Sequence, residues 1–223
     1  MTKSDPKSLL QRMTYWPLRV ARMTGFNLAY YAAVATAGVL SLSNAATADS
    51  TSPKGSNGDL AIPFDANSGN YWRFVSDRVM GGISNGGVKF ISEDGLYYAR
   101  MVGDVSTANN GGFIQFRAGL SLAGMAAKGR YFTGIRLMVR GNDQDYFVHF
   151  RTVDSRRPQD YFAQSFRATS EWQMVELPFA SFKNSRRSSS DKLDPERIRS
   201  MGIVAYGRDH QADIAVATIE FFE

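Results

Sequence analysis

Two glycine-rich stretches hold the polar residues that are best placed to act together. The first, "VSDRVMGGISNGG" (residues 75–87), sets Asp77 and Ser84 around a glycine pair, and the second, "STANNGG" (residues 106–112), sets Asn109 and Asn110 before another. Glycine pairs permit positive φ and close backbone approach, and a short acidic side chain accepts hydrogen bonds from the N–H groups of turns. We therefore predict that the two glycine turns are neighbours and that Asp77 binds backbone N–H groups there.

Two interpretations of these turns stay open. In the structural one, the turns close a corner of the fold, and Trp72 and Met80 plug its end. In the functional one, polar side chains share a rim that hydrogen-bonds a sugar, a peptide or a partner loop, because loops on rigid scaffolds often carry function. The candidate binding residues are Trp72, Asp77, Arg78, Met80, Gly81, Gly82, Ser84, Asn109, Asn110, Gly111, Gly112 and Arg140.

The other residue types restrict the chemistry that the chain offers. The absence of cysteine excludes disulfides, thiolate metal sites and a cysteine nucleophile. Only two histidines occur, His149 and His210, so a multi-histidine metal centre is excluded, and no nucleophile–base–orienter set is visible. The aspartates of "GRDHQAD" and "NDQD" match no specific metal-ligand spacing. We predict that the chain is not an enzyme and holds no catalytic residue, metal or other cofactor.

The net charge of +5 belongs to the first part of the chain. Residues 1–48 hold five basic residues and a single acidic one, so the remainder is nearly neutral. A nucleic-acid-binding surface needs positive charge on the folded body. We therefore predict that nucleic acid is not a partner.

Residues 1–48 are typical of an export leader. A basic start is followed by an apolar run over residues 26–42 and by Ala46-Thr47-Ala48, a signal-peptidase exit. We predict an exported chain, periplasmic or extracellular. An uncleaved leader that anchors it to a membrane stays open, and so does targeting to an organelle such as the mitochondrion or the plastid lumen.

The rest of the chain divides into a flexible linker over residues 49–59, rich in Ser, Gly and Asn, and one body over residues 60–223. Apolar and polar residues alternate in "GIRLMVRGN", "DYFVHFRTV" and "DYFAQSFRAT", with Gly, Asn and Asp between the runs. This alternation predicts many short strands in an antiparallel sandwich or barrel. Short helices are expected in "SLAGMAAKG" (residues 121–129) and after Asp194, where Pro195 suits the first helical position. The pair Arg186-Arg187 in the loop "NSRRSSSD" (residues 184–191) is interpreted as solvated rather than as an anion site.

Four ordered motifs resemble the complex I intermediate-associated protein 30 family, abbreviated CIA30. They are "YWRFVSDRVMGGISNGG", "GDVSTANNGGFIQFR", "IRLMVRGNDQDYFVHFR" and "EWQMVELPFASF", which run over most of the body from about Phe64 to Ile219. The third motif departs from the family pattern at Asn142-Asp143, where Asp-Gly is usual. The resemblance implies an all-β, galactose-binding-like jelly-roll sandwich.

The resemblance also implies a function, that of a non-enzymatic protein-interaction module that assists assembly of respiratory complex I. Its partners would be respiratory-complex subunits. An exported carbohydrate- or small-ligand-binding module stays open as the alternative, because one fold serves many functions. The first reading predicts an exposed apolar patch. The second predicts a cleft with an exposed aromatic ring and convergent amides from Asn109, Asn110 and Gln164.

Overall fold

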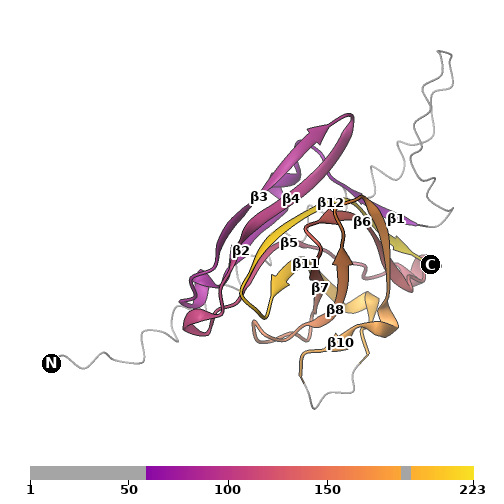
Figure 1. The fold of residues 1–223 in the computed structure, drawn as a ribbon. Coiled ribbons are helices and arrows are strands. Elements are labelled where there is room, and N and C mark those ends of the chain that lie inside the picture. The colour runs from indigo at the N-terminus through magenta and orange to yellow at the C-terminus, as the bar shows by residue number, and fades with distance from the viewer. Residues whose placement is uncertain (1–58, 187–191) are drawn as a thin grey trace. The chain divides into compact units, whose positions relative to one another are not determined.

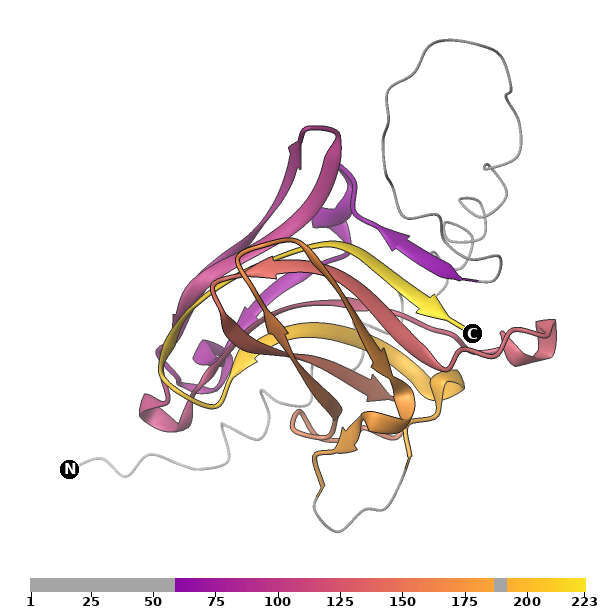
Figure 2. The same cartoon turned by 45° about the vertical axis from the view of Figure 1, so that its right-hand side comes forward.

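The alternating stretches form two antiparallel sheets that pack face to face (Figures 1 and 2). The computed structural model describes residues 59–186 and 192–223. The predicted leader, the linker up to residue 58 and Arg187 lie outside the described residues.

Sheet 1 contains six strands in the order β3-β4-β12-β6-β9, and β1 also pairs with β12. Their bounds are β1 (Leu60–Pro63), β3 (Asn85–Glu93), β4 (Leu96–Val105), β6 (Gly134–Gly141), β9 (Gln173–Pro178) and β12 (His210–Phe222). The long β12 lies in the centre, where it pairs with β4 on one side and β6 on the other.

Sheet 2 contains six strands in the order β10-β8-β7-β11-β5-β2. Their bounds are β2 (Arg73–Ser76), β5 (Phe113–Gly119), β7 (Gln144–Thr152), β8 (Phe162–Ala168), β10 (Lys183–Asn184) and β11 (Ile198–Tyr206). Every pairing in the two sheets is antiparallel. The predicted antiparallel β-sandwich is therefore confirmed.

The core follows from the alternation, because every second side chain of a strand points to the same face. In β6, Ile135 and Val139 are fully buried, and in β7 Val148 and Phe150 are fully buried. The intervening residues face outward on each sheet. Trp72 is also buried, with its ring 5.5 Å from that of Phe64 and 5.3 Å from that of Phe116, so it plugs the sandwich as predicted.

The described helices are single 3-10 turns. They are η1 (Ser68–Asn70), η2 (Asp77–Met80), η3 (Ala108–Asn110), η4 (Ala126–Lys128), η5 (Phe179–Ser181) and η6 (Pro195–Arg197). The two helices predicted from the sequence are thus one turn each, and the Asp194 side chain caps η6 by accepting from the N–H of Glu196 at 2.9 Å. No helix among residues 59–186 and 192–223 has the length and apolar character of a membrane span.

The Asn142-Asp143 departure from the family motif forms the turn that leads from β6 in sheet 1 to β7 in sheet 2. Asp143 adopts a positive φ of 57°, a conformation that aspartate tolerates better than most residues. Asn142 accepts a hydrogen bond from the hydroxyl of Tyr146 at 2.6 Å, and that hydroxyl accepts from the N–H of Asp213 at 2.8 Å. The turn therefore ties the sheet-2 strand β7 to the sheet-1 strand β12.

Candidate functional site

The two glycine turns meet at the carboxylate of Asp77, which is fully buried. Its Oδ1 accepts from the N–H of Ser84 at 2.9 Å. Its Oδ2 accepts from the Ser84 hydroxyl and the N–H of Gly112, both at 2.5 Å, and from the N–H of Phe113 at 3.2 Å. Asp77 therefore ties the β2–β3 loop to the start of β5, and the predicted neighbouring corners are confirmed.

The electrostatics of this corner keep Asp77 ionised. Burial acts to raise its pKa, but hydrogen bonds from Gly112, Ser84 and Phe113 outweigh burial and hold the pKa below the ordinary value of 3.8. A carboxylate that accepts several N–H bonds is stabilised in its charged form. The carboxylate is thus occupied by the protein's own donors and faces no solvent, an arrangement that a structural corner requires.

Gly82 and Gly111 lie so close to the carboxylate of Asp77 that a side chain at either position would clash with it. A Cβ on Gly82 would lie 2.3 Å from Cγ of Asp77, and a Cβ on Gly111 would lie 2.4 Å from its Oδ2. The Gly111 Cβ would also lie 3.0 Å from the Cα of Gly82, so the two loops touch at this point. The neighbouring Gly81 and Gly112 have φ values of 94° and 118°, which disfavour any side chain.

Three apolar side chains project from the corner into solvent, and we call them the apolar tip: Val79, Met80 and Ile83. Their exposed fractions are 68%, 62% and 55%. The prediction that Met80 plugs the fold is wrong. Asp77 occupies the interior at this point, and the single turn η2 followed by Gly81 directs the rest of the loop outward.

The β4–β5 loop lies beside the apolar tip. Asn109 and Asn110 are exposed and adopt positive φ values of 57° and 58°, and the loop reaches the corner at Gly111. Arg78 is exposed on η2. Figures 1 and 2 both show the single-turn helices of these loops at the same end of the sandwich. The structure thus brings the amides, Arg78 and the tip to one end of the body, with Asp77 and Ser84 beneath.

Two other predicted residues lie elsewhere. Arg140 lies on the outer face of sheet 1, where its guanidinium lies 4.9 Å from the ring centroid of Trp172 and 3.6 Å from a carboxylate oxygen of Glu93. Gln164 pairs with Val148 in the middle of sheet 2. Gln164 therefore does not converge with Asn109 and Asn110, and the cleft of amides expected for a sugar-binding site is not formed by these three residues.

The histidines have structural surroundings. The ring of His149 stacks on that of Tyr161, with centroids 4.0 Å apart and an interplanar angle of 11°, and burial lowers the pKa of His149 to about 3. It is therefore uncharged at neutral pH. His210 begins β12, where its Nδ1 lies 2.9 Å from the carbonyl of Arg208. Across the described ranges, no group of three His, Asp or Glu side chains is arranged to hold a metal ion.

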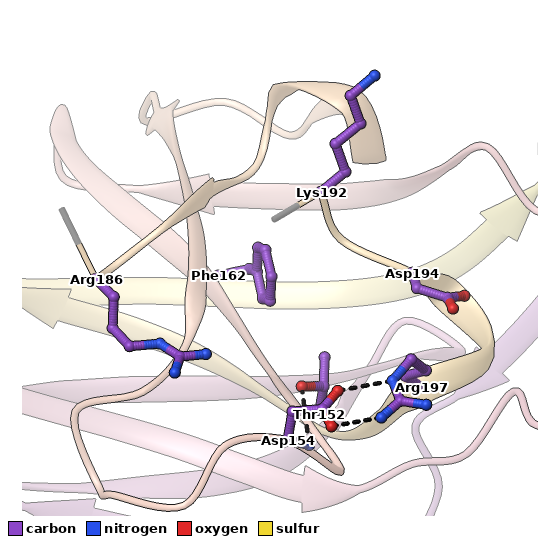
Figure 3. Close-up of a pocket in the computed structure, with 7 residues that line it drawn as sticks. All are labelled: Thr152, Asp154, Phe162, Arg186, Lys192, Asp194 and Arg197. Carbon is purple, nitrogen blue, oxygen red and sulfur yellow. Dashed lines mark hydrogen bonds and ion pairs between the residues drawn. The ribbon is translucent and has the colours of Figure 1, made fainter. Parts of the chain in front are cut away.

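A hollow of about 220 Å³ lies where β7, β8 and η6 meet (Figure 3). Its lining residues are Thr152, Asp154, Phe162, Arg186, Lys192, Asp194 and Arg197. Asp154 forms a bidentate ion pair with Arg197, and the side chain of Asp194 caps η6. Figure 3 shows Lys192 pointing away from the hollow. Both aspartates are thus used in local structure, and the described lining residues form no pair of a base and a nucleophile.

Sequence reasoning missed two features. The exposure of Val79 and Ile83 follows from the shape of the loop, and no periodic pattern predicts it. The second feature is a group of arginines on the outer face of sheet 2, namely Arg117, Arg151 and Arg199. Alternation along β7 could have placed Arg151 outward, but only the strand order brings the three together.

The comparisons with known proteins agree with this structure. The fold resembles that of a family 11 carbohydrate-binding module of a cellulosomal cellulase from Clostridium thermocellum, with a TM-score of 0.53 and 17% identity over 68% of this chain and 87% of the module. A family 11 module from the same organism, in complex with a β-1,3-1,4-mixed-linked tetrasaccharide, gives 0.56 and 16% over 74% and 95%. At these identities the likeness concerns the fold. Compared by sequence, no curated protein matches the chain.

The sequence signature leads to a family. The model of the family described as complex I intermediate-associated protein 30 matches residues 62–216. The matched range includes both glycine turns, the corner at Asp77 and Trp172, which directly precedes β9. It therefore covers most of the β-sandwich. The chain belongs to the complex I intermediate-associated protein 30 (CIA30) family.

Proposed function

We propose that this chain is a non-catalytic protein-binding module that docks through the apolar tip. The observation that carries the proposal is the exposure of Val79, Met80 and Ile83 within five residues of one loop. Isolated exposed apolar side chains are common on soluble proteins, whereas a cluster of them is typical of a contact surface.

The corner beneath the tip supports the proposal. Asp77 holds the β2–β3 loop with bonds to Ser84, Gly112 and Phe113, so the loop is fixed before a partner arrives. A preorganised loop loses less conformational entropy on binding than a flexible one. The buried carboxylate therefore serves the exposed tip, and the structural and functional readings of the motif describe two layers of one site.

The proposed partners are subunits or assembly intermediates of respiratory complex I. This step rests on the family, whose description names a protein associated with complex I intermediates. A factor that holds an unassembled membrane complex needs a surface that recognises apolar protein surface awaiting burial. The apolar tip, flanked by Arg78 and the amides of Asn109 and Asn110, has the apolar centre and polar rim of such an interface.

A carbohydrate-binding module is the second candidate. Its support is the fold shared with the family 11 modules, one of which is described in complex with a tetrasaccharide. In the described part of the chain the aromatic residues exposed to solvent are Tyr97 and Tyr131, on β4 and ahead of β6. They lie apart from Asn109 and Asn110, so the side chains favour the first candidate.

A capture experiment from native membranes tests the proposal. The tagged protein is compared with a variant carrying Val79→Ser, Met80→Ser and Ile83→Ser, and captured proteins are quantified by mass spectrometry. We expect respiratory-complex subunits to be enriched with the wild type and lost with the tip variant. These side chains are exposed, so the variant keeps its fold, which circular dichroism checks.

A variant with Tyr97→Ser is the matched control, since Tyr97 is exposed at 42% on another element. It should capture the same subunits as the wild type. Equal capture by the tip variant would contradict the proposal. Retention on a glycan array without any enriched protein would replace it with the second candidate.

A further inference from the structure

The outer face of sheet 2 carries a group of positive charges that the corner does not explain. We call Arg117, Arg151 and Arg199 the arginine cluster. Gly202 of β11 pairs with His149 of β7 on one side and with Arg117 of β5 on the other. Arg151 lies two residues from His149 on the same face of β7.

The members of the cluster repel one another. Burial, together with the charges of Arg199 and Arg117, lowers the pKa of Arg151 to about 10. Burial also lowers the pKa of Arg117, again with a contribution from Arg199. Asp160 acts in the opposite direction on Arg151, but its carboxylate accepts hydrogen bonds from backbone N–H groups of its own loop. The face therefore holds like charges in close proximity.

The arginines of sheet 1 show a contrasting pattern. Arg100 pairs with Asp213 at 2.7 Å, and Arg136 pairs with Glu176 at 2.8 Å. Among residues 59–186 and 192–223, the arginine cluster has no carboxylate within 4.0 Å. Partly buried charges are normally paired, so an unpaired group is the expected feature of an anion-binding surface.

The hydrogen bonds of the cluster leave donors available. Nη2 of Arg151 donates to the carbonyls of Ser155 and Arg157, at 3.4 and 2.7 Å. Arg199 donates to the carbonyl of Ser155 at 2.8 Å, and Arg117 donates to the hydroxyl of Ser200 at 3.3 Å. Nε of Arg151 is buried and has no hydrogen-bond partner among the described residues. A guanidinium has five N–H donors in a fork that matches a carboxylate.

We propose that the outer face of sheet 2 binds an acidic segment of a protein partner, whose Asp or Glu carboxylates are held by Arg117 and Arg151. The proposal rests on the proposed function in taking the partner to be a protein. Carboxylates two residues apart on an extended segment are about 7 Å apart on one side of it. Because β5 and β7 flank β11, long arginine side chains rising about 10 Å apart can reach such a pair.

The aromatic residues of this face favour a peptide over an acidic saccharide. The ring of His149 stacks on Tyr161, and the ring of Phe147 packs against Tyr206 with centroids 4.6 Å apart. These rings cover one another, and none of them is among the exposed large apolar or aromatic residues of the described chain. A sugar ring would therefore find no open aromatic plane, whereas carboxylates find guanidinium groups.

The test measures binding of labelled peptides by fluorescence anisotropy at low ionic strength. The probe is an eight-residue peptide of alternating Glu and Ser, and its neutral counterpart has Gln in place of Glu. We expect the acidic peptide alone to bind, and the variant Arg117→Gln/Arg151→Gln to weaken it at least tenfold. Arg100→Gln is the matched control, because Arg100 on sheet 1 is already paired with Asp213. It should change the affinity for the acidic peptide less than twofold.

Folding is checked separately by the melting temperature. Gln at both positions removes repulsion and also removes the hydrogen bonds to Ser155, Arg157 and Ser200, so the melting temperature should change little. Arg151→Lys keeps the charge but loses the fork, so it should bind more weakly than wild type and more tightly than the double variant. Equal binding of both peptides, or equal affinity of wild type and double variant, would overturn the proposal. Binding of oligogalacturonate without binding of the acidic peptide would overturn it in favour of a saccharide.

The apolar-tip variant separates this proposal from the proposed function. It should bind the acidic peptide as the wild type does while it loses capture of respiratory subunits. If the wild type binds the acidic peptide but captures no respiratory subunit, the arginine face stands and the proposed partner is wrong. If capture depends on the tip while no peptide binds, the arginine face is wrong and the proposed function stands.

Discussion

Removing the carboxylate of Asp77 should cost a large part of the stability of the domain. In Asp77→Ala, the N–H groups of Ser84, Gly112 and Phe113 lose their acceptor, the first two in buried positions. An unsatisfied buried donor costs about 1–3 kcal/mol. The two buried donors together cost about 2–6 kcal/mol, against a total stability of about 5–15 kcal/mol for a typical domain.

Asp77→Asn tests the same hydrogen bonds with a smaller expected loss of stability, because the amide keeps one acceptor oxygen. The two carboxylate oxygens accept from opposite sides, Oδ1 from Ser84 and Oδ2 from Gly112. An amide has one acceptor oxygen, so its NH₂ group must face a backbone N–H on one side. We expect a loss of about 1–3 kcal/mol for that unsatisfied donor.

The assay is urea unfolding, followed by the fluorescence of buried Trp72 and by circular dichroism. Asp209→Asn is the control, because one oxygen of the exposed Asp209 accepts both bonds from Thr107 at 2.7 Å and an amide oxygen can take its place. It should cost less than about 1 kcal/mol. If Asp77→Ala were as stable as Asp209→Asn, the corner would not be tied by this carboxylate and the reasoning would fail.

Three further variants test the packing, the tip and the pH dependence. Gly111→Ala should destabilise the protein by about 1–3 kcal/mol or more, because its Cβ would lie 2.4 Å from Oδ2 of Asp77. Gly119→Ala is the control: its Cβ would have nothing within 4 Å, so the free energy of unfolding in urea should change by less than about 1 kcal/mol. Met80→Ser should leave stability within about 0.5 kcal/mol while it reduces partner capture. The pKa of His149 is about 3 in the folded protein against an ordinary 6.5, so the unfolded chain takes up a proton first as the pH falls. The contribution of uncharged His149 to the free energy of unfolding is complete above pH 6.5 and is lost toward pH 3. The loss amounts to at most about 1.4 kcal/mol per pH unit. His149→Gln should therefore flatten the dependence of stability on pH between these two values.

The pH profile also reports on Asp77. Its pKa is lowered in the folded protein, so the unfolded chain binds the proton first below the ordinary value of 3.8. The stability from this carboxylate is complete above that pH and is lost as the pH falls through the folded pKa. Asp77→Asn should therefore show a smaller loss of stability between pH 4 and pH 2 than the wild type, and an unchanged acid limb would contradict the ionised corner.

Much of the fold could be predicted because alternation along a strand is a local property. The buried positions of Ile135, Val148 and Phe150 follow from it directly. The hydrogen bonds of Asp77 to backbone N–H groups were also predictable, because a short acidic side chain beside glycine turns accepts from such groups. Met80 was misjudged because it lies in a 3-10 turn, where period-two alternation no longer assigns a face.

The arginine cluster could not be predicted from the sequence because it depends on strand order. Residues 117, 151 and 199 are far apart in the chain, and they meet only because β5 and β7 both pair with β11. Long-range pairing is set by the packing of the whole sandwich, and a local pattern does not contain it. That none of the three has an ion-pair partner within 4.0 Å in the described part of the chain is likewise a property of the assembled face.

Site-specific photo-cross-linking from the apolar tip is the decisive experiment for the proposed docking surface. A photoreactive residue replaces Met80 in the protein bound to its native membranes, and Val153, exposed at 59% on another loop, is replaced in the control. We predict that position 80 cross-links to a subunit of respiratory complex I and that position 153 does not. Equal cross-linking from both positions, or none from position 80 while the protein remains bound, would contradict docking through the tip.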